Sequence, residues 1–173
     1  SNQSISVVTV DNDVSGILLS SIDNLTSENG DTGAFGIRLA TKPTSVVRIA
    51  LSSSNVGEGT VQSFVEFDST NWDVVQAITV TGIDDIPPIS DGAVDYKINI
   101  DSINTTDTDY STLDISSVEG VSFINQDNDA PGIFVKVVND DSSTDEFGST
   151  VRIQFELLAQ PTIGNDVTIP LSI

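Results

Sequence analysis

A segment near the start of the chain returns near its end, and this internal repeat limits the possible folds more than any other feature. Residues 10–22 (VDNDVSGILLSSI) recur as residues 126–138 (QDNDAPGIFVKVV), with Asp-Asn-Asp and Gly-Ile matched at a constant offset. The match continues downstream through Glu28 and Glu146, Gly30 and Gly148, Leu39 and Leu157, Pro43 and Pro161, and Val47 and Val167. Such agreement indicates one repeat of about 116–120 residues.

The repeat divides the chain into three parts. We expect residues 1–13 to be the last strand of a preceding repeat, 14–129 to be one complete repeat, and 130–173 to be the first strands of a following, truncated repeat. No signal peptide opens the chain, so we expect residue 1 to be an artificial or internal boundary.

Apolar and polar residues alternate with a period of two through most of the complete repeat, which is typical of half-buried strands. No run shows a sustained helical period, so the sequence predicts no helix. The alternation predicts seven strands, at residues 16–22, 34–40, 46–52, 60–67, 74–81, 94–100 and 118–125. Seven short strands in a repeat of this length favour an all-β, immunoglobulin-like sandwich, arranged in tandem with partial repeats at both ends.

The composition excludes several functions. The 26 acidic residues outnumber the 6 basic ones and give a formal charge of −20, so we expect no binding to nucleic acid or anionic membrane. Cys and His are absent, which removes thiol nucleophiles, Ser-His-Asp triads and the usual zinc ligand sets. No segment approaches the roughly 20 apolar residues of a membrane span. We therefore expect a protein that is not an enzyme and does not insert into membranes.

Many of the acids fall in loops that the predicted topology brings to one end of the sandwich. Seven strands running up and down place the start and the end of the repeat at opposite poles, and alternate loops share a pole. The C-terminal pole then collects Glu28, Asp31, Glu58, Asp84, Asp85, Asp91, Asp127 and Asp129. Carboxylates that converge on a small volume need a cation to stay ionised. Ca²⁺ fits this set better than Mg²⁺, because it accepts about 6–8 oxygen ligands in flexible geometry.

These residues resemble a known family. An Asp-x-Asp-x-x-Gly-Ile stretch entering the first strand, a Glu in the following loop, and Val-Thr-Gly-Ile-Asp-Asp at residues 80–85 are similar to Calx-β domains. Those domains occur in sodium–calcium exchangers, in integrin β4 and as arrays in bacterial surface proteins. Residues 67–85, with Asn71-Trp72, look especially like the repeats of large bacterial adhesins.

The resemblance implies Ca²⁺ ions at the C-terminal pole. It assigns as ligands Glu28, Asp84, Asp85, Asp91, Asp127 and Asp129, with Glu58 as a weaker candidate. Asp11, Asp13 and Glu146 would belong to partial sites of neighbouring repeats. Residues 86–90 (IPPIS) depart from the family pattern, because calcium-sensing members carry more acids there. This departure favours one or two structural ions over a multi-ion sensor.

Our leading hypothesis is a Ca²⁺-stabilised spacer repeat of an extracellular bacterial adhesin, with neighbouring repeats of the same chain as partners. Two alternatives stay open. One is a carbohydrate- or protein-binding module built on Trp72, Tyr96 or Tyr110, although we expect Trp72 to pack against the core. The other is a filament subunit whose incomplete ends pair between chains by strand addition. Solvated acids without a metal, and a glycosidase carboxylate pair, are further interpretations.

Overall fold

The computed structural model describes residues 5–8, 10, 12–86, 88–138, 143–161 and 164–172. This part of the chain is mostly β, with several antiparallel sheets and one short helix, α1 (Thr108–Ser111). The strands are β1 (Ile17–Asp23), β2 (Leu25–Ser27), β3 (Thr32–Leu39), β4 (Val47–Ser53), β5 (Gly59–Val61), β6 (Phe64–Phe67), β7 (Gln76–Gly82), β8 (Val94–Asn104), β9 (Val121–Gln126), β10 (Ile133–Val138) and β11 (Arg152–Leu157). The predicted all-β class is confirmed at this level.

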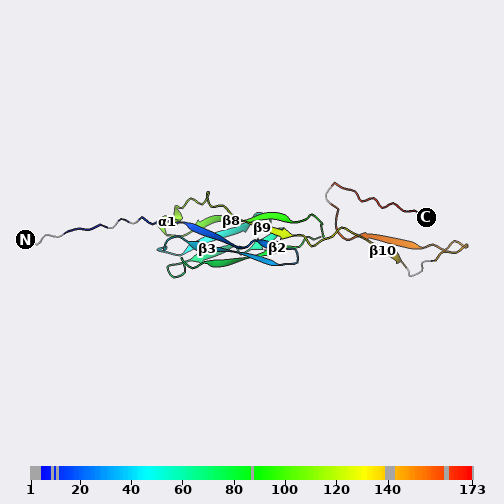
Figure 1. The fold of residues 1–173 in the computed structure, drawn as a ribbon, viewed down its shortest axis with the longest axis horizontal. Helices are drawn as coiled ribbons and strands as arrows, with labels where there is room; N and C mark the ends of the chain where they lie inside the picture. Colours follow the sequence, from blue (N-terminus) through cyan, green and yellow to red (C-terminus); the bar gives the residue numbers. More distant parts are fainter. Residues whose placement is uncertain are drawn as a thin grey trace, which may run out of the picture.

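Two sheets form the main body of the molecule (Figure 1). One has the order β1-β3-β7-β5, and the other has the order β2-β9-β8-β4-β6. Both contribute to one apolar core, and the rings of Phe35 on β3 and Phe123 on β9 meet across it with centroids 6.4 Å apart. Along β4, Val47, Ile49 and Leu51 are buried at alternate positions, as the period of two predicts.

The chain changes sheet at two places that the sequence does not predict. The predicted strand 16–22 matches β1, but the chain then continues as β2, which pairs in parallel with β9 in the opposite sheet. The change of sheet falls at Asp23, whose carboxylate accepts a hydrogen bond from the amide of Leu25, and at Asn24, whose side chain binds the carbonyl of Ser122. The predicted strand 60–67 likewise splits into β5 and β6. The described sheets of the body thus hold nine strands where the sequence predicts seven.

The prediction of no helix is wrong at α1, a single turn between β8 and β9. Asp107 caps it by accepting hydrogen bonds from the amides of Asp109 (2.9 Å) and Tyr110 (3.0 Å). The Tyr110 ring is buried, and its hydroxyl donates to the carbonyl of Thr41. One turn is too short to leave a hydrophobic period in the sequence, so the pattern could not indicate it.

The Asp107 carboxylate ties this turn to the loop after β3. Thr44 donates two hydrogen bonds to the other carboxylate oxygen, from its amide and its hydroxyl, each 2.7 Å long. Burial of Asp107 favours the neutral acid and raises its pKa, but the bonds from Thr44, Tyr110 and Asp109 together outweigh burial and lower the pKa to about 2. The folded protein therefore holds Asp107 ionised more strongly than the unfolded chain does.

Replacing Asp107 with Asn should destabilise the fold by about 1–2 kcal/mol at neutral pH, because one acceptor oxygen becomes an amide that faces donors. The folded pKa lies below the unfolded value of 3.8, so this stability is present above pH 3.8 and is lost as pH falls toward 2. Urea unfolding of both proteins at several pH values measures the difference. Asp114→Asn, an exposed site, is the matched control, and equal midpoints for Asp107→Asn and wild type at pH 7 would contradict this account.

The hairpin β10–β11 repeats the first hairpin of the body. Ile133 pairs with Leu157 as Ile17 pairs with Leu39, so the observed register agrees with the repeat in the sequence. The hydrogen bond from the Leu158 amide to the Gly132 carbonyl likewise matches the bond from Ala40 to Gly16. The environments differ, because Leu39 is fully buried whereas Leu157 is 38% exposed.

The two ends of the chain leave the main body on opposite sides (Figure 1). The hairpin β10–β11 lies beyond one end of the body, and the N-terminal segment lies beyond the other end. Residues 5–8, 10, 12 and 13, predicted to belong to a strand, form none. A strand needs a neighbour for its backbone hydrogen bonds, and no described strand lies beside this segment.

Candidate metal site

Five carboxylates meet where β2, β7 and β9 end. Glu28 follows β2, Asp85 and Asp91 lie in the β7–β8 loop, and Asp127 and Asp129 follow β9. They form two groups that share Glu28, one with Asp85 and Asp91 and one with Asp127 and Asp129. Within each group, carboxylate oxygens from all three residues lie within 4.8 Å of one another. These clusters could hold a metal ion.

Strand pairing sets this convergence. Parallel pairing of β2 with β9 places Ser27 beside Gln126, and the Glu28 amide donates to the Gln126 carbonyl at 3.0 Å. The end of β7 lies against the same segment at Gly82, whose amide donates to the Asp31 carbonyl at 3.1 Å. A Cβ at Gly82 would lie 2.2 Å from the Ser27 carbonyl oxygen, so only glycine permits this approach. Three strands therefore deliver their following loops to one place.

Glu28 is the centre of the cluster. Its side chain is 5% exposed, and one carboxylate oxygen accepts a hydrogen bond from the Asn128 amide at 2.9 Å. Burial raises the pKa of Glu28 to about 7, and the charges of Asp127, Asp85 and Asp129 add to the increase, while the bond from Asn128 opposes it. A carboxylate in this position is stabilised by taking up either a proton or a cation.

The aspartates around Glu28 are crowded in the same way. Burial raises the pKa of Asp85, and the nearby charges of Asp91, Asp129 and Asp127 raise it further. Asp127 accepts hydrogen bonds from the amides of Gly92 (2.8 Å) and Asp129 (2.6 Å), which links the β7–β8 loop to the end of β9.

One carboxylate oxygen of this cluster lowers the stability of the fold when no cation is bound. Oδ2 of Asp129 is buried and has no hydrogen-bond partner among the described residues. A buried acceptor without a donor costs about 1–3 kcal/mol, and more when it is charged. A cation bound by Glu28, Asp127 and Asp129 would satisfy this oxygen.

Glu58 contributes more to this region than the sequence indicated. It is 8% exposed and accepts a hydrogen bond from the side chain of Asn125 at 3.2 Å. Burial raises its pKa, and the charges of Asp91, Asp85 and Asp127 raise it further, while the bond from Asn125 opposes the increase. Glu58 belongs to neither three-residue group, but charges of the same cluster raise its pKa.

Asn125 is a residue that sequence reasoning missed. It is 1% exposed and also donates to the Ile83 carbonyl, while its carbonyl oxygen accepts a hydrogen bond from the Thr26 hydroxyl. The Thr26 hydroxyl lies 3.0 Å from the hydroxyl of the buried Tyr96. The available signal was a polar residue at an inward position of a strand, and this network supports the acidic cluster from within the body.

The remaining predicted ligands lie elsewhere. Asp84 is exposed and belongs to neither group, although its charge contributes to the raised pKa of Asp85. Asp13 and Glu146 are also exposed and outside both groups, and Asp11 lies outside the described residues. The structure thus brings together five of the six predicted ligands of the complete repeat.

The carboxylate oxygens of this cluster could hold a hard cation. Carboxylate and carbonyl oxygens suit Ca²⁺, which tolerates irregular geometry and a variable number of ligands. The aromatic residues considered for a binding module do not form an exposed patch. Tyr96 and Tyr110 are buried, and Trp72 is partly buried against the core, as expected.

Neither a protein-family model nor a curated protein matches this sequence. Among the described residues, no helix has the length and hydropathy needed to cross a bilayer.

Proposed function

We propose that this chain is a Ca²⁺-stabilised, non-catalytic spacer made of tandem Calx-β-like sandwich repeats. The observation that carries the proposal is the convergence of Glu28 with two pairs of aspartates at the end of the body from which the hairpin emerges. Asp127 and Asp129 lie in the connecting segment itself. A cation bound there would hold the connection against the loops of the body.

The proposed mechanism is electrostatic. Without a cation, Glu28, Asp85 and Asp127 repel one another, as the raised pKa of Glu28 indicates. With Ca²⁺ bound, the same residues become ligands that tie the connecting segment to the β7–β8 loop. Binding to the folded state alone stabilises it by RT ln(1 + [L]/Kd), about 2.7 kcal/mol when the ligand is at a hundredfold excess over Kd.

The tandem arrangement rests on the two hairpins. They share register and the same closing hydrogen bond, while apolar residues that are buried in the first are exposed in the second. We interpret β10–β11 as the opening of a further repeat. Partner repeats of the same chain, rather than nucleic acid or lipid, also suit a surface with a charge of −20.

The proposed location is an extracellular bacterial surface, in an adhesin. Extracellular Ca²⁺-binding modules typically bind with Kd values of about 10⁻⁴–10⁻³ M, which matches calcium concentrations outside cells. An acidic, cysteine-free sandwich needs another means of stabilisation than disulfides, and bound Ca²⁺ supplies one.

Thermal unfolding with and without millimolar Ca²⁺ tests this function. We expect Ca²⁺ to raise the Tm of the wild type, and Mg²⁺ at the same concentration to raise it much less. Asp85→Asn should lose most of the Ca²⁺ effect because Asp85 belongs to a group with Glu28. Asp84→Asn is the matched control. Asp84 is adjacent to Asp85 in the sequence, but it is exposed and lies outside both groups. An unchanged Tm in Ca²⁺ would contradict the proposal, because the cluster would then hold no stabilising cation.

A further inference from the structure

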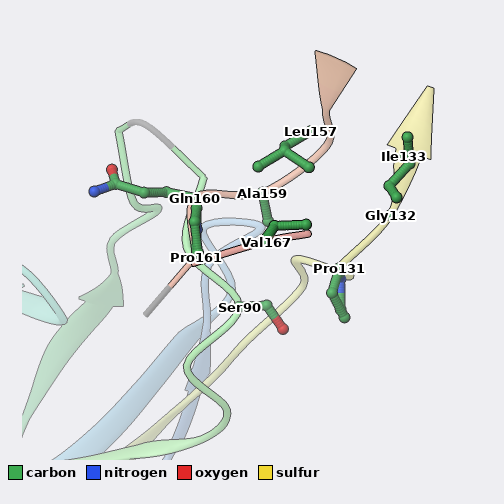
Figure 2. A pocket seen from close by; sticks show the side chains of 9 residues that line it. All are labelled: Ser90, Pro131, Gly132, Ile133, Leu157, Ala159, Gln160, Pro161 and Val167. Atoms are coloured by element: carbon green, nitrogen blue, oxygen red, sulfur yellow. The ribbon is translucent and has the colours of Figure 1, made fainter. Parts of the chain in front are cut away.

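The β7–β8 loop reaches across to the segment that follows β11. The Gln160 amide donates a hydrogen bond of 2.6 Å to the Pro88 carbonyl, and Ile89 forms a parallel bridge with Gln160. A cavity of about 520 Å³ lies beside this contact (Figure 2). Its lining comes from both sides, with Ser90 from the loop and Pro131, Ile133, Leu157, Ala159 and Val167 from the hairpin region.

The same loop is anchored in the acidic cluster. Asp85 and Asp91 stand at its two ends, and both group with Glu28. The tip, at Pro88 and Ile89, carries no acid and contacts the hairpin segment instead.

The complete repeat has the equivalent turn on its opposite side. Thr41 and Lys42 correspond to Ala159 and Gln160, because Leu39 corresponds to Leu157 in both sequence and register. A hollow of about 450 Å³ lies at this turn. It is lined by Asp13, Val14, Ser15, Thr41, Lys42 and Asp109, together with Thr112.

The backbone of this turn indicates what the hollow fits. The Gln160 amide has an acceptor in Pro88, whereas the Lys42 amide has none within the described part of the chain. Lys42 adds one cation to the lining, and Asp13 and Asp109 add two carboxylates, so charge does not select the partner. The surface therefore fits a loop that presents a backbone carbonyl, as Pro88 does to Gln160.

We infer that the turn at Thr41 and Lys42 is a docking surface for the β7–β8 loop of a preceding repeat. The contact between Gln160 and Pro88 is the same docking one repeat later. The inference rests on the proposed tandem function and deepens it by naming the partner as a loop like residues 88–90 of the preceding repeat. The loop then joins the cation cluster of one repeat to the first hairpin of the next.

The contact itself is tested in the full chain by distances between spin labels. Because the sequence has no cysteine, Thr60→Cys and Gln154→Cys place labels only on β5 and β11. Gln160→Pro removes the amide donor, and Gln160→Ala keeps it. The Gln160 side chain extends away from the other labelled side chains in Figure 2, so the alanine variant should match the wild type. We expect Gln160→Pro to broaden the distance distribution about twofold, as for domains without a firm interface.

The outcomes separate the two proposals. Equal distributions for Gln160→Pro and Gln160→Ala would overturn the docking inference, provided that the Leu158 amide remains protected and the hairpin is intact. If Ca²⁺ raises the Tm in that case, the proposed function stands alone. Broadening in Gln160→Pro without any Ca²⁺ response would instead support docking and remove the proposed role of Ca²⁺.

The Lys42 surface is tested in a lengthened chain in which residues 14–129 occur twice before residue 130. Asp127-Asn128-Asp129 of the first copy then precedes Val14 of the second, as Asp11-Asn12-Asp13 does in the original. We expect the Lys42 amide of the second copy to exchange with solvent about tenfold more slowly than that of the first, since a docked carbonyl protects it. Equal exchange in the two copies would overturn the inference.

Discussion

Relative to the wild type, a Glu28→Gln variant should be more stable without Ca²⁺ and less stable when Ca²⁺ saturates the wild-type site. Without the metal, we expect a variant that is more stable than the wild type by about 1–2 kcal/mol, because a buried, repelled charge is removed. With Ca²⁺ at about a hundredfold excess over Kd, we expect the variant to show little or no further stabilisation. The wild type should gain on the order of 2–3 kcal/mol under the same conditions.

The structure gives the reason for both signs. The pKa of Glu28 is raised to about 7 by burial and by neighbouring aspartates, so its ionised form costs free energy when no cation is present. The amide side chain of the variant keeps an oxygen that can accept the bond from the Asn128 amide, so that contact survives. The substitution removes the one carboxylate that both three-residue groups share.

The matched control is Glu119→Gln, which makes the same change of charge at an exposed position outside both groups. Urea or thermal unfolding of the three proteins, each with and without Ca²⁺, gives the comparison. A Glu28→Gln variant that loses stability without metal and keeps the full response to Ca²⁺ would show that Glu28 is a structural residue and not a ligand.

Gly82→Ala should cost about 3 kcal/mol or more in free energy of unfolding, because the fold leaves no room for a methyl group there. The added Cβ would lie 2.2 Å from the carbonyl oxygen of Ser27 and 2.6 Å from Oδ1 of Asn125. The Ser27 oxygen is backbone and can move only by shifting β2 away from β7. Since Glu28 directly follows β2, we expect the same variant to weaken Ca²⁺ binding.

Gly16→Ala is the control for this substitution. A Cβ at Gly16 would meet only the Ala40 Cβ, at an ordinary contact distance of 3.6 Å. Unfolding in urea compares the two variants with the wild type, and calorimetric Ca²⁺ titration follows the site. Similar midpoints for Gly82→Ala and Gly16→Ala would show that β2 and β7 are not held as closely as the structure indicates.

The sequence predicted the strands of this protein better than their assignment to sheets. Alternation located β3, β4, β7, β8 and β9 to within a few residues, because inward positions such as Ile37 and Ile49 must be apolar. A strand that leaves one sheet for the other keeps the same alternation, so nothing in the pattern marked the break after Val61. The sequence placed the end of the first strand to within a residue, but it did not predict β2. Both changes of sheet depend on side-chain hydrogen bonds and on the opposite sheet.

The candidate site was predictable to a similar degree. Counting strands placed Glu28, Asp85 and Asp127 at one pole without knowledge of any contact. The count could not separate Asp85 from Asp84, since adjacent residues of a loop differ only in the direction of their side chains. It also could not reveal the burial of Glu58, which depends on Asn125 beneath it.

Isothermal titration of the full chain with Ca²⁺, beside Glu28→Gln, tests the central claim most directly. We expect saturable binding to the wild type with a Kd of about 10⁻⁴–10⁻³ M, weak or no binding of Mg²⁺, and loss of Ca²⁺ binding in the variant. Absence of saturable Ca²⁺ binding, or equal binding by wild type and Glu28→Gln, would contradict the account.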